Sequence, residues 1–322
     1  MPNSSPRPVI LDVDTGYDDA LALLLALRTP ALQVLGITCV HGNQTLDQVV
    51  VNTLKVLDAA GASDIPVAAG MRHPLIETVR PPSLIHGHDG LADLDLPPSS
   101  RRVVDLHAVE FLRRQLSQAT EPVTIIALAP LTNIAVLWRM YPELAEKIAG
   151  LTIMGGTYID FGNTAPVSEF NIRVDPEAAA IVLQSGLPIK LYPLDVFRQI
   201  RFYQTEIPQF QAGSDPAAQM AGGIFAYACA HFQADYSLIG DAGAVATVID
   251  PAGATFERAP ISVELSGSVT RGQTVLDRRA VPQQMQVTEW WKPPKTEIEV
   301  VTAVDIERYR TMFREAMFSR AR

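Results

Sequence analysis

Cysteines, long apolar runs and an export signal are scarce or missing in this 322-residue chain. Only Cys39 and Cys229 occur, too few for the disulfide framework of a small secreted domain. The longest apolar run, residues 20–27, is far shorter than the roughly 20 residues that cross a bilayer. The first residues, MPNSSPRP, are polar and rich in proline. We therefore expect a protein of the reducing cytoplasm with no membrane partner.

The chain also lacks an excess of basic residues. Its formal net charge is −9, which argues against nucleic acid or an anionic membrane surface as the main partner. Charged residues make up only 19% and hydrophobic residues 48%, so a sizeable core is available and disorder is not expected. Repeats, blocks of one charge, low-complexity tracts and a clean linker are all missing. We expect one domain over residues 1–322.

What the sequence does contain is a regular alternation of strand and helix patterns. Strands are predicted at 9–13, 33–40, 66–69, 123–128, 151–154 and 189–194; helices are predicted after residue 16, at 45–60, from about 105, after 130 and at 176–184. Further strands near 261–267, 273–277 and 297–301 precede a helix from about residue 304. The pattern predicts an α/β fold, a Rossmann-like, mostly parallel sheet flanked by helices, with extra C-terminal strands and helices.

Four carboxylates lie within eight residues where the first strand gives way to the first helix. They are Asp12, Asp14, Asp18 and Asp19. Such a density of negative charge beside apolar segments is unfavourable unless something compensates it. The N-terminus of a helix compensates about one carboxylate, and a bound divalent cation would compensate the others. A cluster of oxygen ligands suits a hard ion, Ca²⁺ or Mg²⁺, better than zinc.

Other interpretations of these acids exist. Asp18 and Asp19 alone are also typical of capping acids in the first turn of a helix. An EF-hand loop begins with the same D-x-D, but Gly16 stands where its third ligand belongs and Leu23 where its closing Glu belongs. A D-x-D-x-T phosphatase needs Thr at the place of Gly16. Neither of the last two patterns fits the residues.

The segment DVDTGYDDA, residues 12–20, resembles the DxDPGxDDA signature of the inosine–uridine-preferring nucleoside hydrolase family. Further segments match the family in the same order, from residue 9 to about 250. They are HGN at 41–43, APLTN at 129–133, MGG at 154–156, Asn163, EFN at 169–171, DPEAA at 175–179 and AVA at 244–246 after Asp241. The resemblance implies hydrolysis of the N-glycosidic bond of a small ribonucleoside, with Ca²⁺ as cofactor. It also implies a homodimer or a homotetramer.

The resemblance further assigns roles to single residues. Ca²⁺ would be held by Asp14, Asp19, Asp241 and the backbone carbonyl of Leu128. Asp18 would act as the general base on a water bound to the metal, and Asp12 would support the cluster from behind.

The sugar and the base have their own candidate residues under the same resemblance. Asn163 and Glu169 would hold the ribose 5′-hydroxyl, and Asn171 the 2′- and 3′-hydroxyls. Asparagine and glutamate together provide the donors and acceptors that hydroxyls need. Asn43, Met154 and Asp241 would also face the substrate. Tyr227 would contact the base, and His86 resembles an active-site histidine of the family.

The sequence departs from the family at one functional place. The family has His-Asp-Pro where this chain has Gly240, Asp241 and Ala242. That histidine protonates or contacts the leaving base in several members, so this step has no assigned residue here. His88 and His231 are possible substitutes. Phe225 and Phe232, near Tyr227, are interpreted as core residues.

Two alternative functions stay open for this reason. The chain could hydrolyse a different ribosyl substrate, such as a modified nucleoside or a nicotinamide or ADP-ribosyl compound. It could also be a non-catalytic relative that binds metal and ribose. The irregular segment at 71–100 favours the first alternative, because a long loop in a compact domain is usually functional.

Overall fold

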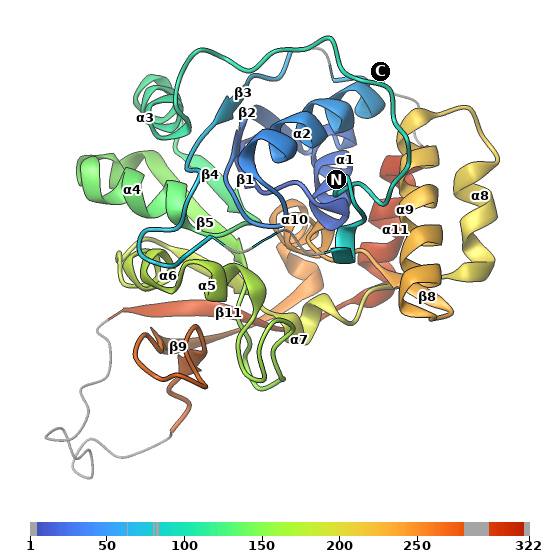
Figure 1. Cartoon of the computed structure of the whole chain (residues 1–322). Coiled ribbons are helices and arrows are strands. Elements are labelled where there is room, and N and C mark those ends of the chain that lie inside the picture. The colour runs from blue at the N-terminus through green and yellow to red at the C-terminus, as the bar shows by residue number, and fades with distance from the viewer. Residues whose placement is uncertain (1–4, 63, 80, 82–83, 280–295, 319–322) are drawn as a thin grey trace, which may run out of the picture.

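The computed structural model describes residues 5–62, 64–79, 81, 84–279 and 296–318. Its centre is a nine-stranded sheet in the order β10-β9-β11-β6-β5-β4-β1-β2-β3, seen nearly edge-on in Figure 1. The strands from β11 to β3 run parallel; at the β11 edge β9 pairs antiparallel with β11, and β10 pairs antiparallel with β9. The predicted fold class is confirmed, including the extra C-terminal strands.

The strands are short, as is common in sheets that helices cover on both faces. Their bounds are β1 Arg7–Val13, β2 Leu32–Cys39, β3 Val67–Ala69, β4 Val123–Ala127, β5 Ile148–Met154, β6 Ile189–Tyr192, β9 Ala254–Val263, β10 Thr274–Leu276 and β11 Glu297–Val304. A separate antiparallel ribbon consists of β7 Arg201–Tyr203 and β8 Tyr236–Leu238.

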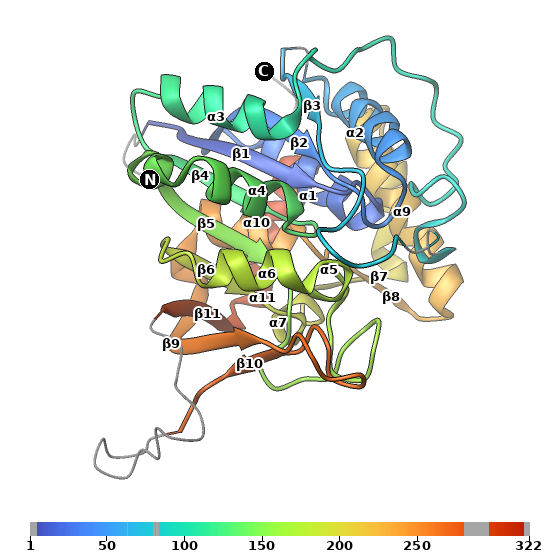
Figure 2. The ribbon, with the colours of Figure 1, turned by 60° about the vertical axis from the view of Figure 1, so that its left-hand side comes forward.

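Helices cover both faces of the large sheet, as Figure 2 shows. One face carries α1 Tyr17–Arg28, α2 Leu46–Ala60, α9 Pro216–Phe232, α10 Ala242–Ile249 and α11 Ile306–Phe318. The other face carries α3 Ala108–Gln118, α4 Thr132–Met140 and α6 Pro176–Leu183. Three shorter helices, α5 Phe170–Val174, α7 Leu194–Phe197 and α8 Ile207–Gln211, complete the set. No helix among the described residues is long and apolar enough to cross a membrane.

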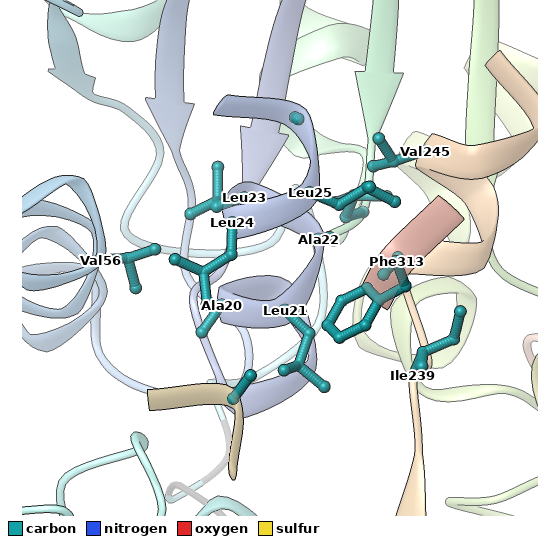
Figure 3. Packing of buried hydrophobic residues seen from close by; sticks show 14 of the residues in the cluster. Ala20, Leu21, Ala22, Leu23, Leu24, Leu25, Val56, Ile239, Val245 and Phe313 are labelled. Carbon is teal, nitrogen blue, oxygen red and sulfur yellow. The ribbon is translucent and has the colours of Figure 1, made fainter. Parts of the chain in front are cut away.

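The helix α1 explains why the sequence after Gly16 is apolar all round. Residues 20–26 are buried on every side, because α1 lies between the sheet and the helices α2, α10 and α11. Figure 3 shows Leu21 facing Phe313 of α11 and Leu24 facing Val56 of α2. Burying a leucine side chain contributes roughly 1.5–3 kcal/mol, so this helix is firmly anchored. Its N-terminus, which carries Asp18 and Asp19, is fixed with it.

Some predicted strand bounds were wrong. The strand predicted at 261–267 covers Ala254–Val263, because residues 254–260 pair with β11 despite the charged Glu257 and Arg258, and residues 261–263 pair with β10. The strand predicted at 189–194 ends at Tyr192, since Pro193 has no N–H to donate to a neighbouring strand. The β7–β8 ribbon was not predicted at all.

Candidate active site

A cavity of about 730 Å³ opens beyond the carboxyl ends of β1, β4 and β5. Ligands of parallel α/β sheets bind at this edge, where the loops after neighbouring strands converge. Most of the predicted site residues line this cavity: Asp18, Asn43, His86, Leu128, Met154, Asn163, Glu169, Asn171 and Asp241. Residues that are far apart in the sequence therefore meet in one place.

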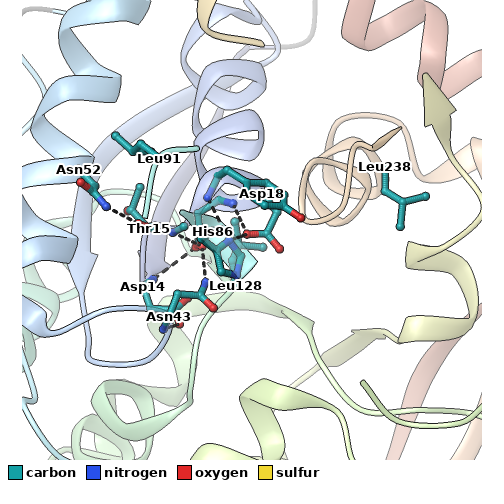
Figure 4. A network of polar contacts seen from close by, with 12 residues as sticks. Asp14, Thr15, Asp18, Asn43, Asn52, His86, Leu91, Leu128 and Leu238 are labelled. Carbon is teal, nitrogen blue, oxygen red and sulfur yellow. Dashed lines mark hydrogen bonds and ion pairs between the residues drawn. The ribbon is translucent and has the colours of Figure 1, made fainter. Parts of the chain in front are cut away.

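The turn between β1 and α1 aims the acids at the floor of the cavity. Asp19 accepts the backbone N–H of Gly16 at 3.0 Å and that of Asp14 at 3.3 Å. Asn43, after β2, holds two acids at once. Its N–H donates to Asp14 at 2.6 Å and its amide donates to Asp19 at 3.2 Å. Figure 4 shows Asn43 beside Asp14, with Asp18 at the start of the helix.

Close packing around Asp14 explains a glycine of the HGN segment. A Cβ on Gly42 would lie 1.9 Å from Oδ2 of Asp14. Any other residue would displace either the backbone or the carboxylate. Gly42 therefore lets the loop after β2 approach the acid closely enough for Asn43 to bind it.

Asp18, Asp19 and Asp241 each offer a carboxylate oxygen within 4.8 Å of the other two. Burial raises the pKa of Asp19 and Asp241 well above the usual range, and the charges of neighbouring aspartates raise it further. Asp14 shows the same effect, and its buried Oδ1 has no hydrogen-bond partner among the described residues. Oxygen ligands, mutual repulsion and an unpartnered buried oxygen all fit a hard divalent cation. These residues can hold a metal ion.

The carbonyl of Leu128 lies at the end of β4, beside this cluster. It accepts the side-chain amide of Asn171 at 2.8 Å, and the same amide reaches the carbonyl of Met154 at 3.2 Å. Asn171 thus connects the loops after β4 and β5 from the first turn of α5. The structure brings together Leu128, Met154 and Asn171 as the sequence predicted, although their roles toward metal and sugar stay predictions.

Glu169 is the N-cap of α5 and is buried at the cavity wall. Its carboxylate accepts the backbone N–H groups of Gly156, Asn171 and Ile172. Burial raises its pKa to about 7, against the opposing effect of these hydrogen bonds. Asn163 lies next to it, and its side-chain oxygen accepts the N–H of Phe170 at 2.9 Å. The pair faces the cavity as a fixed polar wall.

His86 packs against the first turn of α1. Its Nδ1 accepts the backbone N–H of Tyr17 at 3.3 Å and lies 3.5 Å from Oδ1 of Asp18. Burial lowers the pKa of His86, although Asp18 opposes this change. The ring is therefore neutral near pH 7. Because Nδ1 accepts the hydrogen bond from the backbone N–H of Tyr17, the single ring proton of His86 lies on Nε2. The ring of Tyr17 lies over it, with centroids 4.6 Å apart.

Asp12 is not part of the group formed by Asp18, Asp19 and Asp241, and its partners are Thr38 and Asn133. Its Oδ1 accepts the hydroxyl of Thr38 at 2.5 Å and the amide of Asn133 at 2.8 Å, while Oδ2 finds no hydrogen-bond partner in the part of the chain that the structure describes. Burial raises its pKa to about 7. Asp12 therefore ties β1 to β2 and α4 beneath the site.

The aromatic side chains of α9 differ partly from expectation. Phe225 is fully buried, which confirms its interpretation as core. Phe232 is 53% exposed and lines the cavity, so the same interpretation was wrong for it. The hydroxyl of Tyr227 donates to the carbonyl of Leu84 at 3.3 Å. Tyr227 is not among the described cavity-lining residues, and its contact with a base stays a prediction.

Sequence reasoning missed several cavity-lining side chains. They are Tyr17, Phe161, Phe197, Arg198, Arg201 and Tyr236. Tyr17 had a usable signal, since it lies inside the acid motif. Phe197 and Arg198 follow the carboxyl end of β6, so the rule that ligands bind beyond the carboxyl ends of parallel strands could have predicted them. Arg201 and Tyr236 had none, because three-residue strands leave no clear pattern.

Gly240 has a positive φ of 55° and lines the cavity beside Asp18. Glycine adopts this left-handed conformation without steric cost, unlike most residues. The residue before Asp241 therefore offers no side chain to a substrate in this chain.

Comparison with known proteins shows which family this chain belongs to. The model of the family described as inosine–uridine preferring nucleoside hydrolase matches residues 9–311. The chain belongs to this family. The nucleoside hydrolases are N-glycosidases, and relatives span nearly the whole chain. The inosine–uridine preferring nucleoside hydrolase of Leishmania major is 35% identical over 318 residues, 97% of this chain and 98% of the relative.

Other nucleoside hydrolases differ in the bases that their names state. The pyrimidine-specific ribonucleoside hydrolase RihA of Enterobacter sp. (strain 638) is 38% identical over 275 residues, 84% of this chain and 88% of the relative. The solved structure of a purine-preferring ribonucleoside hydrolase from Gardnerella vaginalis is 29% identical, with a TM-score of 0.87 over 97% of this chain and 98% of that chain. The shared fold thus serves enzymes named for different bases.

Proposed function

We propose that this chain is a Ca²⁺-dependent ribonucleoside hydrolase, which cleaves the N-glycosidic bond to give ribose and the free base. The observation that carries the proposal is the cluster of Asp18, Asp19 and Asp241, within 4.8 Å of one another on the floor of a cavity. We assign Ca²⁺ to Asp14, Asp19, Asp241 and the carbonyl of Leu128, since all offer oxygen ligands. When bound, the ion would orient a water molecule and lower its pKa.

Asp18 is the general base in this proposal. Its side chain is 18% exposed, so it reaches the cavity more than its buried neighbours do. It takes the proton of the attacking water while the water oxygen bonds to C1′ of the ribose. The electron pair of the broken C–N bond leaves with the base, through a ribosyl centre with oxocarbenium character.

The polar wall of the cavity orients the sugar. Asn163 and Glu169 bind the 5′-hydroxyl, while Asn171 and Asp241 bind the hydroxyls at C2′ and C3′. A site built to satisfy hydroxyls discriminates strongly against a substrate without them, because its buried polar groups then lack partners. His86, with its proton on Nε2, is the candidate donor toward the leaving base.

Ribose release tests the activity. We expect the wild-type protein to release ribose from at least one of inosine, uridine, cytidine and adenosine, and to lose this activity in a chelator. Added Ca²⁺ should restore it. Release that a chelator does not change would contradict the metal dependence, and no release from any of the four would contradict the common-nucleoside proposal.

A further inference from the structure

The β7–β8 ribbon forms one side of the cavity and is held in place from behind. Phe202, in the middle of β7, stacks on Phe225 with ring centroids 5.1 Å apart inside the core. Side chains alternate between the two faces of a strand, so its neighbour Arg201 points to the other face. Arg201 pairs with Leu238 of β8, and Tyr203 pairs with Tyr236. The buried Phe202 thus holds β7 and β8 in place, with Arg201 and Tyr236 on the opposite face of the ribbon.

Arg201 and Tyr236 are in contact at the cavity wall. The guanidinium of Arg201 lies over the Tyr236 ring, 4.2 Å from its centroid, which is a favourable cation–π distance. Both side chains line the same cavity as Asp18 and Asp241. The backbone carbonyl of Arg201 also accepts the side chain of Arg310 from α11. The Arg310 contact thus holds the backbone of Arg201, and the Tyr236 ring supports its guanidinium.

Among the residues that the structure describes, no carboxylate pairs with Arg201. The neighbouring Arg198 differs, because it pairs with Asp160 and donates to the carbonyls of Phe161 and Gly162. Arg198 thus stabilises the loop after β5, whereas the guanidinium of Arg201 makes no ion pair within the described part of the chain.

The ribbon stands close to the acids. Only two residues separate Leu238 at the end of β8 from Asp241 of the acid cluster. Three residue steps span at most about 10 Å, so the ribbon and the acid cluster are neighbours along the cavity wall. In Figure 4, Leu238 and Asn52 lie on opposite sides of Asp18, and Asn43 lies on the same side as Asn52. Gly240 lies between the ribbon and Asp241 and adds no side chain. The cavity is therefore acidic at its floor and cationic at its ribbon side.

We propose that Arg201, seated on Tyr236, is a specificity-determining residue that selects ribosides whose leaving group carries a carboxylate. The inference rests on the proposed function, which places the ribose on the acidic floor of the cavity that Arg201 also lines. A guanidinium binds a carboxylate through two parallel charge-assisted hydrogen bonds, and a neutral carboxamide makes weaker ones.

Nicotinic acid riboside and nicotinamide riboside make a matched pair of probes, because they differ only in carboxylate against carboxamide. We would titrate both by calorimetry into Ca²⁺-loaded Asp18→Asn protein, which prevents turnover. The acid should bind about 10-fold or more tightly, as expected for a charge-assisted pair. Adding Arg201→Gln should bring the ratio close to one, whereas Arg201→Lys should retain part of it. Arg278→Gln is the control, since Arg278 stacks on Tyr158 outside the cavity.

Each outcome separates this inference from the proposed function. Equal binding of the two ribosides, or a ratio that survives Arg201→Gln, overturns the inference. Binding of neither, in a protein whose wild type hydrolyses uridine or inosine, also overturns it and leaves the proposed function standing. If no common ribonucleoside is hydrolysed, the proposed function fails, and the binding ratio still decides the role of Arg201.

Discussion

The ring of Phe197 closes the space beside Gly240, where a side chain at residue 240 would have to lie. An ideal Cβ on Gly240 would be 2.9 Å from Cζ of Phe197 and 3.0 Å from Cβ of Asp18. Gly240, which stands where the family signature has a histidine, therefore packs against the ring of Phe197 from α7. Glycine at this place is part of the packing of the chain.

We expect Gly240→His to destabilise the protein instead of restoring a leaving-group acid. The positive φ and the contact with Phe197 together should lower the free energy of unfolding by about 2 kcal/mol or more. Combining it with Phe197→Ala should cost less than the sum of the two single changes, because the smaller residue makes room. Urea unfolding of the four proteins measures this coupling. Strict additivity would contradict the match between the two residues.

His86 is the remaining histidine at the cavity, and its role depends on the leaving group. We expect His86→Gln to slow hydrolysis of a natural ribonucleoside by about 100-fold, because the Nε2–H of the neutral ring would stabilise the departing base through a hydrogen bond. Hydrolysis of 4-nitrophenyl riboside should change little, since nitrophenolate leaves without a proton. His88→Gln is the control, because His88 is exposed and does not line the cavity. Equal losses on both substrates would show that His86 only supports the structure.

His41 links the site to the pH dependence of stability. Burial lowers its pKa from 6.5 to about 4, while its Nε2 lies 3.3 Å from the hydroxyl of Thr132. The unfolded chain therefore binds this proton more readily, so unfolding becomes easier as the pH falls from about 6.5 toward 4. Between pH 7 and 4.5 this group should remove about 2 kcal/mol of stability.

Urea unfolding of wild type and His41→Gln at both pH values measures that contribution. The variant should lose about 2 kcal/mol less than the wild type across this range. The comparison cancels the carboxylates, which titrate in both proteins. An identical loss in the two proteins would mean that His41 is not held neutral by burial.

The sequence was sufficient to predict the sheet and the acid cluster, for a physical reason. Buried parallel strands are continuous apolar segments, and the acids that follow β1 interrupt such a segment sharply. The edge rule for parallel sheets then places Asn43, Leu128 and Asn171 at one end. Each of these predictions needs only local patterns and the order of the strands.

The side of the cavity beyond Gly240 could not be predicted in this way. Arg201 and Tyr236 meet only because two three-residue strands pair and Phe202 anchors them in the core. Phe232 was assigned to the core because an aromatic residue on a helix is usually buried, yet it ends α9 where the cavity begins. Long-range packing decides both cases.

The most direct test of the account compares Asp18→Asn with Asp241→Asn in calorimetric Ca²⁺ titrations and in ribose release. Asp18→Asn should bind Ca²⁺ within a few-fold of wild type and lose about 10²–10⁴ of the hydrolytic rate, because it lacks only the general base. Asp241→Asn should lose both. An Asp18→Asn protein that still hydrolyses ribonucleosides at the wild-type rate, or that loses Ca²⁺ as fully as Asp241→Asn, would contradict the assignment of Asp18 as the base beside the metal.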